Sequence, residues 1–265
     1  MPDASVITQG FGISDEKSRG ELPVQGELLG VEQLELYAAA LATEHRVVHG
    51  PGRPDTLLKR LAENGRTLAA MYRSTTDAVQ RDRPISFSGE WILNNFHIIQ
   101  DQLRECAEDL PWRYYLGLPK LEGGEFAGLP RVYALVASIV EHSDGHFERE
   151  TLARCIRAYQ SVSILTIGEL WAVPIALRLA LLESLARLAA QVDRARVEIE
   201  TADGLVDELV AASVRGRAAV ETTMSKRVAT LSATTTTMFV AEMLQRLRDQ
   251  GDELDPAIAW LEGRL

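Results

Sequence analysis

The feature that most constrains the fold is a long apolar repeat between residues 185 and 209. Its members recur at alternating spacings of three and four, a pattern typical of an α-helix whose apolar stripe packs along another helix. They are Leu185, Leu188, Val192, Ala195, Ile199, Ala202, Val206 and Leu209. The repeat favours an antiparallel partner helix within the same chain, and a coiled coil between two chains is the alternative. Gly204 lies inside the repeat and is a candidate point of interruption.

Helical periodicity also covers most of the remaining chain, and no convincing strand alternation is found. The other expected helices lie at about residues 27–49, from 55 to a loop near 83–84, and at 88–109, 131–141, 149–160, 238–250 and from 255 onward. We therefore predict an all-α fold, a bundle of about eight to nine helices with no significant β-sheet. Residues 1–26 are expected to form a flexible lead-in, because they combine Gly, Ser, Pro and acids without periodicity. Residues 27–265 are expected to form a single helical domain, with a candidate sub-boundary at residues 111–130.

The charge balance excludes several kinds of partner. The formal net charge is −10, and basic residues are interleaved with acidic ones. Nucleic acid and acidic lipid would be repelled by such a chain, so neither is expected as a partner. The longest apolar stretch, residues 162–192, is interrupted by charged residues, so no membrane span is predicted.

The start of the sequence and its cysteines suggest where the chain resides. Residues 1–5 lack the basic and apolar regions of a signal peptide, so a cytoplasmic location is expected. Cys106 and Cys155 lie far apart in sequence and are expected to be reduced and buried as small hydrophobic side chains.

A helix start is encoded by Thr166 and Glu169. A Thr followed three residues later by Glu is the pattern of a capping box, in which each side chain satisfies a backbone N–H of the other residue. Gln can also close such a box, so Glu169→Gln is expected to preserve most of the fold. Pro174 follows within the same helix and is expected to kink it near residues 170–174.

The motifs that usually carry catalysis or metal binding are absent from the sequence. His45 and His49 have the spacing of two metal ligands on one helix, but no third ligand is evident, so no metal site is predicted. His97, between Phe96 and Ile98, is expected to be a core histidine. No catalytic residue is predicted, although Glu90 and Glu169 each precede a Trp and could form the carboxylate pair of a small glycosidase.

The middle of the chain contains a concentration of aromatic and polar residues that has two interpretations. It can form a hydrogen-bonded core between helices, which is favoured, or a ligand or interaction surface. The candidate residues for such a surface are Trp112, Tyr114, Tyr115, Arg131, Tyr133, Tyr159, Gln160, Glu169 and Trp171.

Three segments resemble the amino-terminal helical region of cyclic β-1,2-glucan synthases, which are large bacterial inner-membrane enzymes. They are residues 90–99 (EWILNNFHII), residues 118–121 (LPKL) with 130–135 (PRVYAL), and residues 157–162 (RAYQSV) with 165–174 (LTIGELWAVP). The resemblance covers about residue 30 to the end. The family usually has Asp where this chain has Asn94, which leaves the role of this position open.

The resemblance implies a glycosyltransferase as the whole enzyme. Such a synthase uses UDP-glucose and a divalent metal to build and cyclise β-1,2-glucan, with its transferase module downstream of the segment seen here. No cofactor is expected in the segment itself. The missing catalytic motifs and the apolar repeat favour a non-catalytic scaffold or regulatory domain, and the resemblance implies a location at the cytoplasmic face of the inner membrane. Its partner would be the downstream glycosyltransferase module or a second copy.

Two other functions remain open on the sequence alone. One is a module that binds β-1,2-glucan through Trp112, Tyr114, Tyr115 and Tyr133, with a tyrosine that carries protein-linked glucan as a variant. The other is a small free-standing glycan-active enzyme that uses Glu90 and Glu169.

Overall fold

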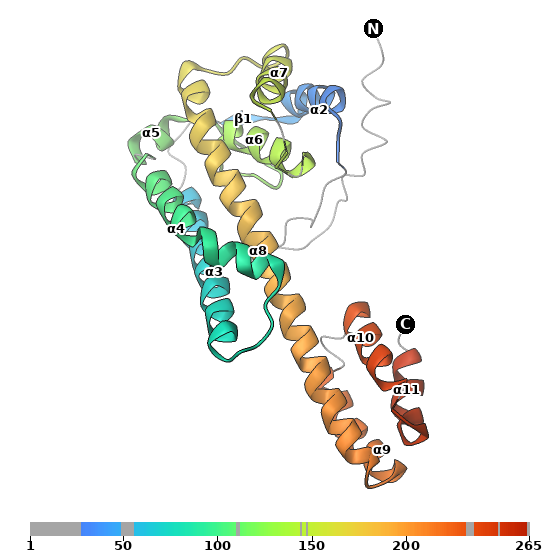
Figure 1. Cartoon of the computed structure of the whole chain (residues 1–265). Helices are drawn as coiled ribbons and strands as arrows, with labels where there is room; N and C mark the ends of the chain where they lie inside the picture. Colours follow the sequence, from blue (N-terminus) through green and yellow to red (C-terminus); the bar gives the residue numbers. More distant parts are fainter. Residues whose placement is uncertain are drawn as a thin grey trace. The chain divides into compact units, whose positions relative to one another are not determined.

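The computed structural model describes residues 28–48, 56–109, 112–143, 145–146, 148–231, 236–248 and 250–263. The predicted lead-in, residues 1–26, lies outside the described residues. Within them the chain forms ten α-helices, one short 3-10 helix and one pair of two-residue strands (Figure 1). The predicted all-α fold is confirmed.

The chain divides into two compact units, each built from segments far apart in the sequence. Unit 1 consists of residues 1–56 and 109–184, and unit 2 consists of residues 57–108 and 185–265. Helix α8 (Ile167–Ser213) belongs to unit 1 up to residue 184 and to unit 2 beyond it. The helix continues through Pro174 and Gly204. The single helical domain expected over residues 27–265 stays a prediction.

Unit 1 is organised around helix α6 (Arg131–His142), of which nearly every residue is buried. A helix that is apolar on all sides is normally found in the interior of a fold. Helices α2 (Val31–Glu44) and α7 (Arg149–Gln160) pack against each other and share a core with α6. The buried residues of this core are Leu29, Leu34, Ala38, Ala42, Leu135, Ile139, Cys155, Tyr159 and Leu165.

The segment of the candidate sub-boundary, between residues 111 and 130, contains regular structure. It contains the short helix α5 (Trp112–Gly117) and strand β2 (Lys120–Leu121). Strand β2 pairs antiparallel with β1 (Val47–Val48), with Val47 opposite Leu121. The pairing joins segments about seventy residues apart, which explains why local periodicity gave no sign of it.

In unit 2, helices α3 (Thr56–Gln80) and α4 (Phe87–Glu108) pack closely together. The Tyr72 and Phe96 rings are stacked with their centroids 4.2 Å apart. A Cβ atom placed on Gly89 would lie 3.0 Å from Cγ2 of Thr75, so a glycine permits this close approach. His97 is exposed on α4, so the expectation of a core histidine is wrong.

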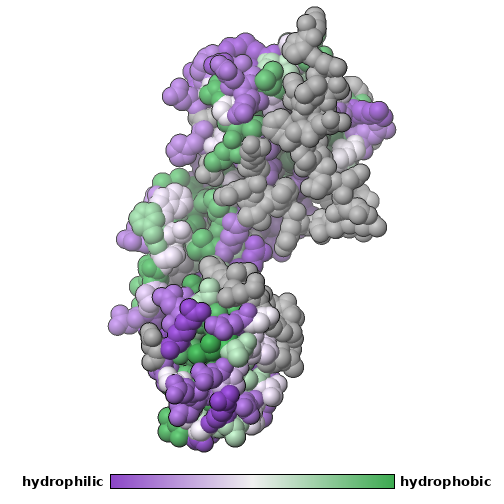
Figure 2. Space-filling view, turned by 90° about the vertical axis from the view of Figure 1, so that its right-hand side faces the viewer, coloured by the Kyte–Doolittle hydropathy of each residue, from purple (hydrophilic) through white to green (hydrophobic). Residues whose placement is uncertain are grey.

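The rest of unit 2 is a second core, which buries the last part of the apolar repeat. Ala202, Val206 and Leu209 of α8 pack with buried residues of α9 (Arg217–Leu231), α10 (Thr237–Leu247) and α11 (Asp255–Glu262). A 3-10 turn, Asp252–Leu254, precedes α11. These three residues at the end of the repeat therefore have their partners in the same chain. The surface of α10 and α11 that faces the viewer in Figure 2 is mostly hydrophilic.

None of the described helices combines the length and the apolar character that a membrane span requires.

Candidate functional site

A buried ion pair joins the first residue of α6 to the first turn of α8 in unit 1. Arg131 donates from Nε to Oε1 of Glu169 at 2.6 Å and from Nη2 to Oε2 at 2.9 Å. Two parallel hydrogen bonds of this kind are the strongest arrangement of a guanidinium and a carboxylate. Glu169 is fully buried and Arg131 nearly so. The hydrogen bonds with Glu169 raise the pKa of Arg131, so the guanidinium keeps its charge despite its burial.

The remaining polar atoms of the pair bind the loop between α7 and α8. Arg131 donates from Nη1 to Oγ of Ser163 at 2.8 Å and from Nη2 to the carbonyl of Ile164 at 2.7 Å. Glu169 accepts from N and Oγ1 of Thr166 at 2.8 and 3.0 Å, and its own N–H donates to Oγ1 of Thr166 at 3.2 Å. The predicted capping box is therefore confirmed. The ion pair and the capping box form one network, which satisfies its buried charges.

Tyr159 at the end of α7 lies beside this network and contacts a histidine from another helix. Its Oη lies 3.0 Å from Nδ1 of His45, the residue that follows α2. Burial, together with the nearby charge of Arg131, lowers the pKa of His45 to about 4. Burial raises the pKa of Tyr159. Both side chains are therefore neutral near pH 7.

The other tyrosines of the candidate set point to separate places in unit 1. Tyr114 of α5 donates to the carbonyl of Gly168, at the edge of the network. Tyr133 donates to Glu183, farther along α8, and both residues are buried. Tyr115 is buried, with Nζ of Lys120 5.3 Å from its ring centroid.

The structure thus brings together Arg131, Tyr159 and Glu169 from the predicted set and adds residues from outside that set. Gln160 is half-buried at the end of α7, and the side chain of Trp112 lies outside the described residues. The sequence singled out His45 only as a candidate metal ligand and did not single out Ser163, because their partners lie 114 and 32 residues away in the sequence. Only the Thr166 capping pattern carried a local signal.

Trp171 behaves differently from the rest of the set because its side chain is 78% exposed. It is part of an apolar group on the outside of the same loop and helix start, where Ile164 is 80% and Ile167 is 73% exposed. We call this group the apolar corner. It consists of Val162, Ile164, Ile167, Leu170 and Trp171.

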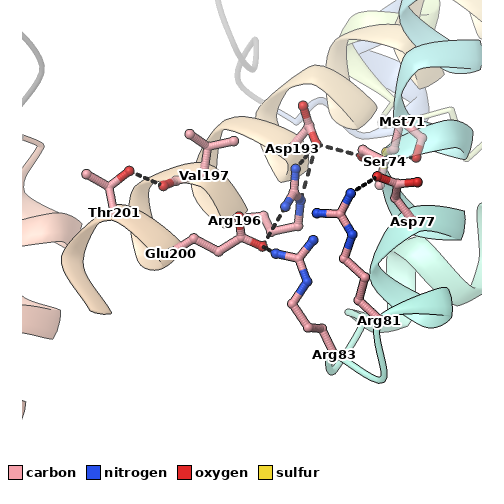
Figure 3. Close-up of polar contacts among 10 residues, drawn as sticks. All are labelled: Met71, Ser74, Asp77, Arg81, Arg83, Asp193, Arg196, Val197, Glu200 and Thr201. Atoms are coloured by element: carbon pink, nitrogen blue, oxygen red, sulfur yellow. Dashed lines mark hydrogen bonds and ion pairs between the residues drawn. The ribbon is translucent and has the colours of Figure 1, made fainter. Parts of the chain in front are cut away.

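A second polar cluster joins α3 and α8 inside unit 2 (Figure 3). Asp193 accepts from Oγ of Ser74 at 3.0 Å and from Nη2 of Arg196 at 3.0 Å. Glu200 accepts from Nη1 of Arg196 at 2.6 Å and from Nη1 of Arg83 at 3.1 Å. Burial acts to lower the pKa of Arg196, but the hydrogen bonds with the two acids outweigh it and raise the pKa.

This second cluster pairs every one of its charges at the surface of two packed helices. Arg81 is paired with Asp77 at 2.9 Å on α3 in the same way. Such half-exposed pairs contribute little stability each, about 0–1 kcal/mol. Their geometry is that of a contact between helices. Among the described residues, no three His, Cys, Asp or Glu side chains lie together as the ligands of a metal ion would.

Comparison with known proteins gives a relative for almost the whole chain. No family model matches it. The chain is 30% identical over 242 residues, 91% of its length, to the cyclic beta-(1,2)-glucan synthase NdvB of Rhizobium meliloti (strain 1021). This chain is related to a region of the cyclic β-(1,2)-glucan synthase family. The matched region spans only 8% of the synthase from R. meliloti. The resemblance to cyclic glucan synthases seen in the sequence is thereby confirmed.

Proposed function

We propose that this chain is a non-catalytic helical domain that scaffolds or regulates a cyclic β-(1,2)-glucan synthase. One observation carries the proposal. The charged residues of its richest polar cluster, Arg131 and Glu169, are buried and bind each other and the surrounding backbone. Their arrangement serves to hold a loop in place.

The same geometry argues against the alternative of a small glycosidase. A catalytic carboxylate must come within hydrogen-bonding distance of its substrate. Both oxygens of Glu169 are bound by Arg131 or Thr166, and the side chain has no exposed surface. Glu90 lies exposed in the first turn of α4, where an acid is favoured by the helix dipole.

The relation to the synthase supports the choice of partner. The relative's name assigns it the synthesis of cyclic β-(1,2)-glucan, and the matched region is a small fraction of it. Glucosyl transfer from UDP-glucose with a divalent metal is therefore proposed for the longer polypeptide, outside the matched region. The proposed location of the domain is the cytoplasmic face of the inner membrane.

A second candidate function is binding of β-1,2-glucan, and the exposure of Trp171 favours it. A flat exposed aromatic ring can stack on a sugar. The original set for this function is reduced, because Tyr115 and Tyr133 are buried. Calorimetric titration of the chain with β-1,2-glucan oligomers tests this candidate, and absence of heat at millimolar ligand would contradict it.

The scaffold proposal is tested by removing the matched region from the synthase of R. meliloti and measuring cyclic glucan from UDP-glucose. We expect the deletion to lower glucan output at least about tenfold, which corresponds to about 1.4 kcal/mol. A chimera that contains this chain in place of the matched region should recover the output. Full output from the deletion, with equal amounts of protein in the membrane, would contradict the proposal.

A further inference from the structure

The apolar corner gives the first turns of α8 an apolar surface on two opposite sides. Ile167, Leu170, Trp171 and Pro174 recur at i, i+3, i+4 and i+7, and all four are exposed. Ala172, Val173 and Ala176 of the same turns are buried in unit 1. A helix that is apolar around its circumference is normally covered on all sides. The exposed side is therefore a surface of unit 1 on which a partner would bury apolar side chains.

The composition of the corner fits a protein partner better than a sugar or a membrane. Residues 161–171 contain one charged residue, Glu169, which points inward. Interface centres are depleted of charge and enriched in large apolar and aromatic side chains. A sugar site needs several converging polar groups, which Ile164, Ile167 and Leu170 cannot provide. An anionic membrane surface would attract a basic segment, and this segment contains no Lys or Arg.

The buried network beneath the corner fixes its backbone. Arg131 holds Ser163 and the carbonyl of Ile164, and Glu169 holds the N–H of Thr166. Tyr114 holds the carbonyl of Gly168. The side chains of Ile164, Ile167 and Trp171 extend outward from this fixed segment. A surface that is already ordered loses little entropy when it binds, so it is suited to docking.

We propose that the apolar corner docks against an apolar surface in another module of the same synthase polypeptide. This inference rests on the proposed function. More than nine tenths of the related synthase lies outside the matched region. The rest of the polypeptide would therefore be a covalently linked partner with a large surface, present at high effective concentration. A second copy is the weaker choice, because each copy carries a net charge of −10 and the two would repel.

The experiment uses the chimera described above and a pair of matched double variants. Ile167→Gln/Trp171→Gln changes the apolar corner, and Phe87→Gln/Val214→Gln changes two equally exposed apolar residues elsewhere. We expect the first variant to lower glucan output at least about tenfold and the second to leave it unchanged. Both should leave the melting temperature of the isolated chain unchanged within about 2 °C, since all four residues are exposed.

A photo-crosslinking amino acid at position 167 of the chimera identifies the occupant. We expect crosslinks to peptides from the synthase part of the chimera, outside the inserted chain. We expect no such crosslinks when the probe is at position 214. Crosslinks between two copies of this chain, to lipid or to glucan would overturn the inference and name the occupant instead.

The outcomes separate this inference from the proposed function. If the chimera is active but the corner variant keeps full output and position 167 forms no crosslink, the docking surface is wrong and the scaffold function stands. If the deletion variant keeps its full glucan output, or if the expressed chimera is as inactive as the deletion variant, the scaffold function and the docking surface are both wrong.

Discussion

Arg131 and Glu169 form a two-point ion pair across 38 residues of sequence, with one partner at the start of α6 and the other in the first turn of α8. The pair closes the base of the α7–α8 loop, and the apolar corner lies on the outer side of that loop. The buried pair thus helps to fix the backbone of the segment that presents the apolar corner.

Glu169→Gln should destabilise the chain by about 3–5 kcal/mol, because it leaves the Arg131 guanidinium buried without a counter-charge. The sequence alone predicts a mild effect, since Gln can close the capping box, and the ion pair changes that expectation. Urea denaturation measures the loss. The matched exposed variant, Arg157→Met, breaks the surface pair with Glu150 and should cost less than about 1 kcal/mol.

The double variant Arg131→Met/Glu169→Leu completes this test. Replacing both charges by apolar groups removes the buried unpaired charge, so the loss should be smaller than for Glu169→Gln. A larger loss in the double variant would show that the hydrogen bonds to the loop matter more than the pairing of charges.

Trp171→Ala should change the free energy of unfolding by less than about 1 kcal/mol, because most of the ring is exposed. Tyr133→Ala, at a buried aromatic of the same unit, should cost about 3–5 kcal/mol. Thermal or urea unfolding of the two variants decides the matter. Similar losses from both would mean that Trp171 is buried in solution, and the apolar corner would then lose its central residue.

His45 should make the stability of the chain depend on pH. Its pKa falls from 6.5 in the unfolded chain to about 4 in the fold, so the unfolded state binds more protons between these values. The contribution of neutral His45 is fully present above pH 6.5 and is lost as the pH falls toward 4. His45→Gln should flatten this part of the stability profile, whereas the exposed control His97→Gln should retain it. A profile for His45→Gln as steep as that of the unmodified chain would contradict the assignment.

Cys106 and Cys155 should react with a thiol reagent only after unfolding. Both are fully buried, and burial raises the pKa of Cys155 to about 11, so little thiolate is present at neutral pH. The reagent releases a coloured thiolate when it reacts. Its absorbance without and with denaturant measures how many thiols react in the native chain and how many react only after unfolding. Rapid reaction of either thiol in the native chain would show that its core opens readily.

Local sequence signals predicted the parts of this structure that depend on neighbouring residues. The capping box of Thr166 and Glu169 lies within four residues, and its pattern was sufficient. The helical periodicity of α3 and the end of the apolar repeat in α8 likewise indicated buried side chains, such as Leu68 and Leu209. The same repeat also predicted burial of Leu188 and Ile199, which is wrong, because both are exposed.

The long-range contacts had no such signal. The approach of His45 to Tyr159 and the pairing of β1 with β2 join segments that only the tertiary fold brings together. The exposure of Trp171 was not predictable for the same reason. Periodicity places this residue on a helix but does not say whether another element covers it. The sequence named most residues of the network without revealing which of them bind one another.

The most direct test of the central claim is sugar turnover by the isolated full chain. The chain is incubated at high concentration with UDP-glucose, Mg²⁺ and β-1,2-glucan, and the products are analysed by mass spectrometry. We expect no transfer and no cleavage above a denatured control. Turnover that disappears in Glu169→Gln, at a temperature where this variant is still folded, would contradict it and make Glu169 a catalytic residue.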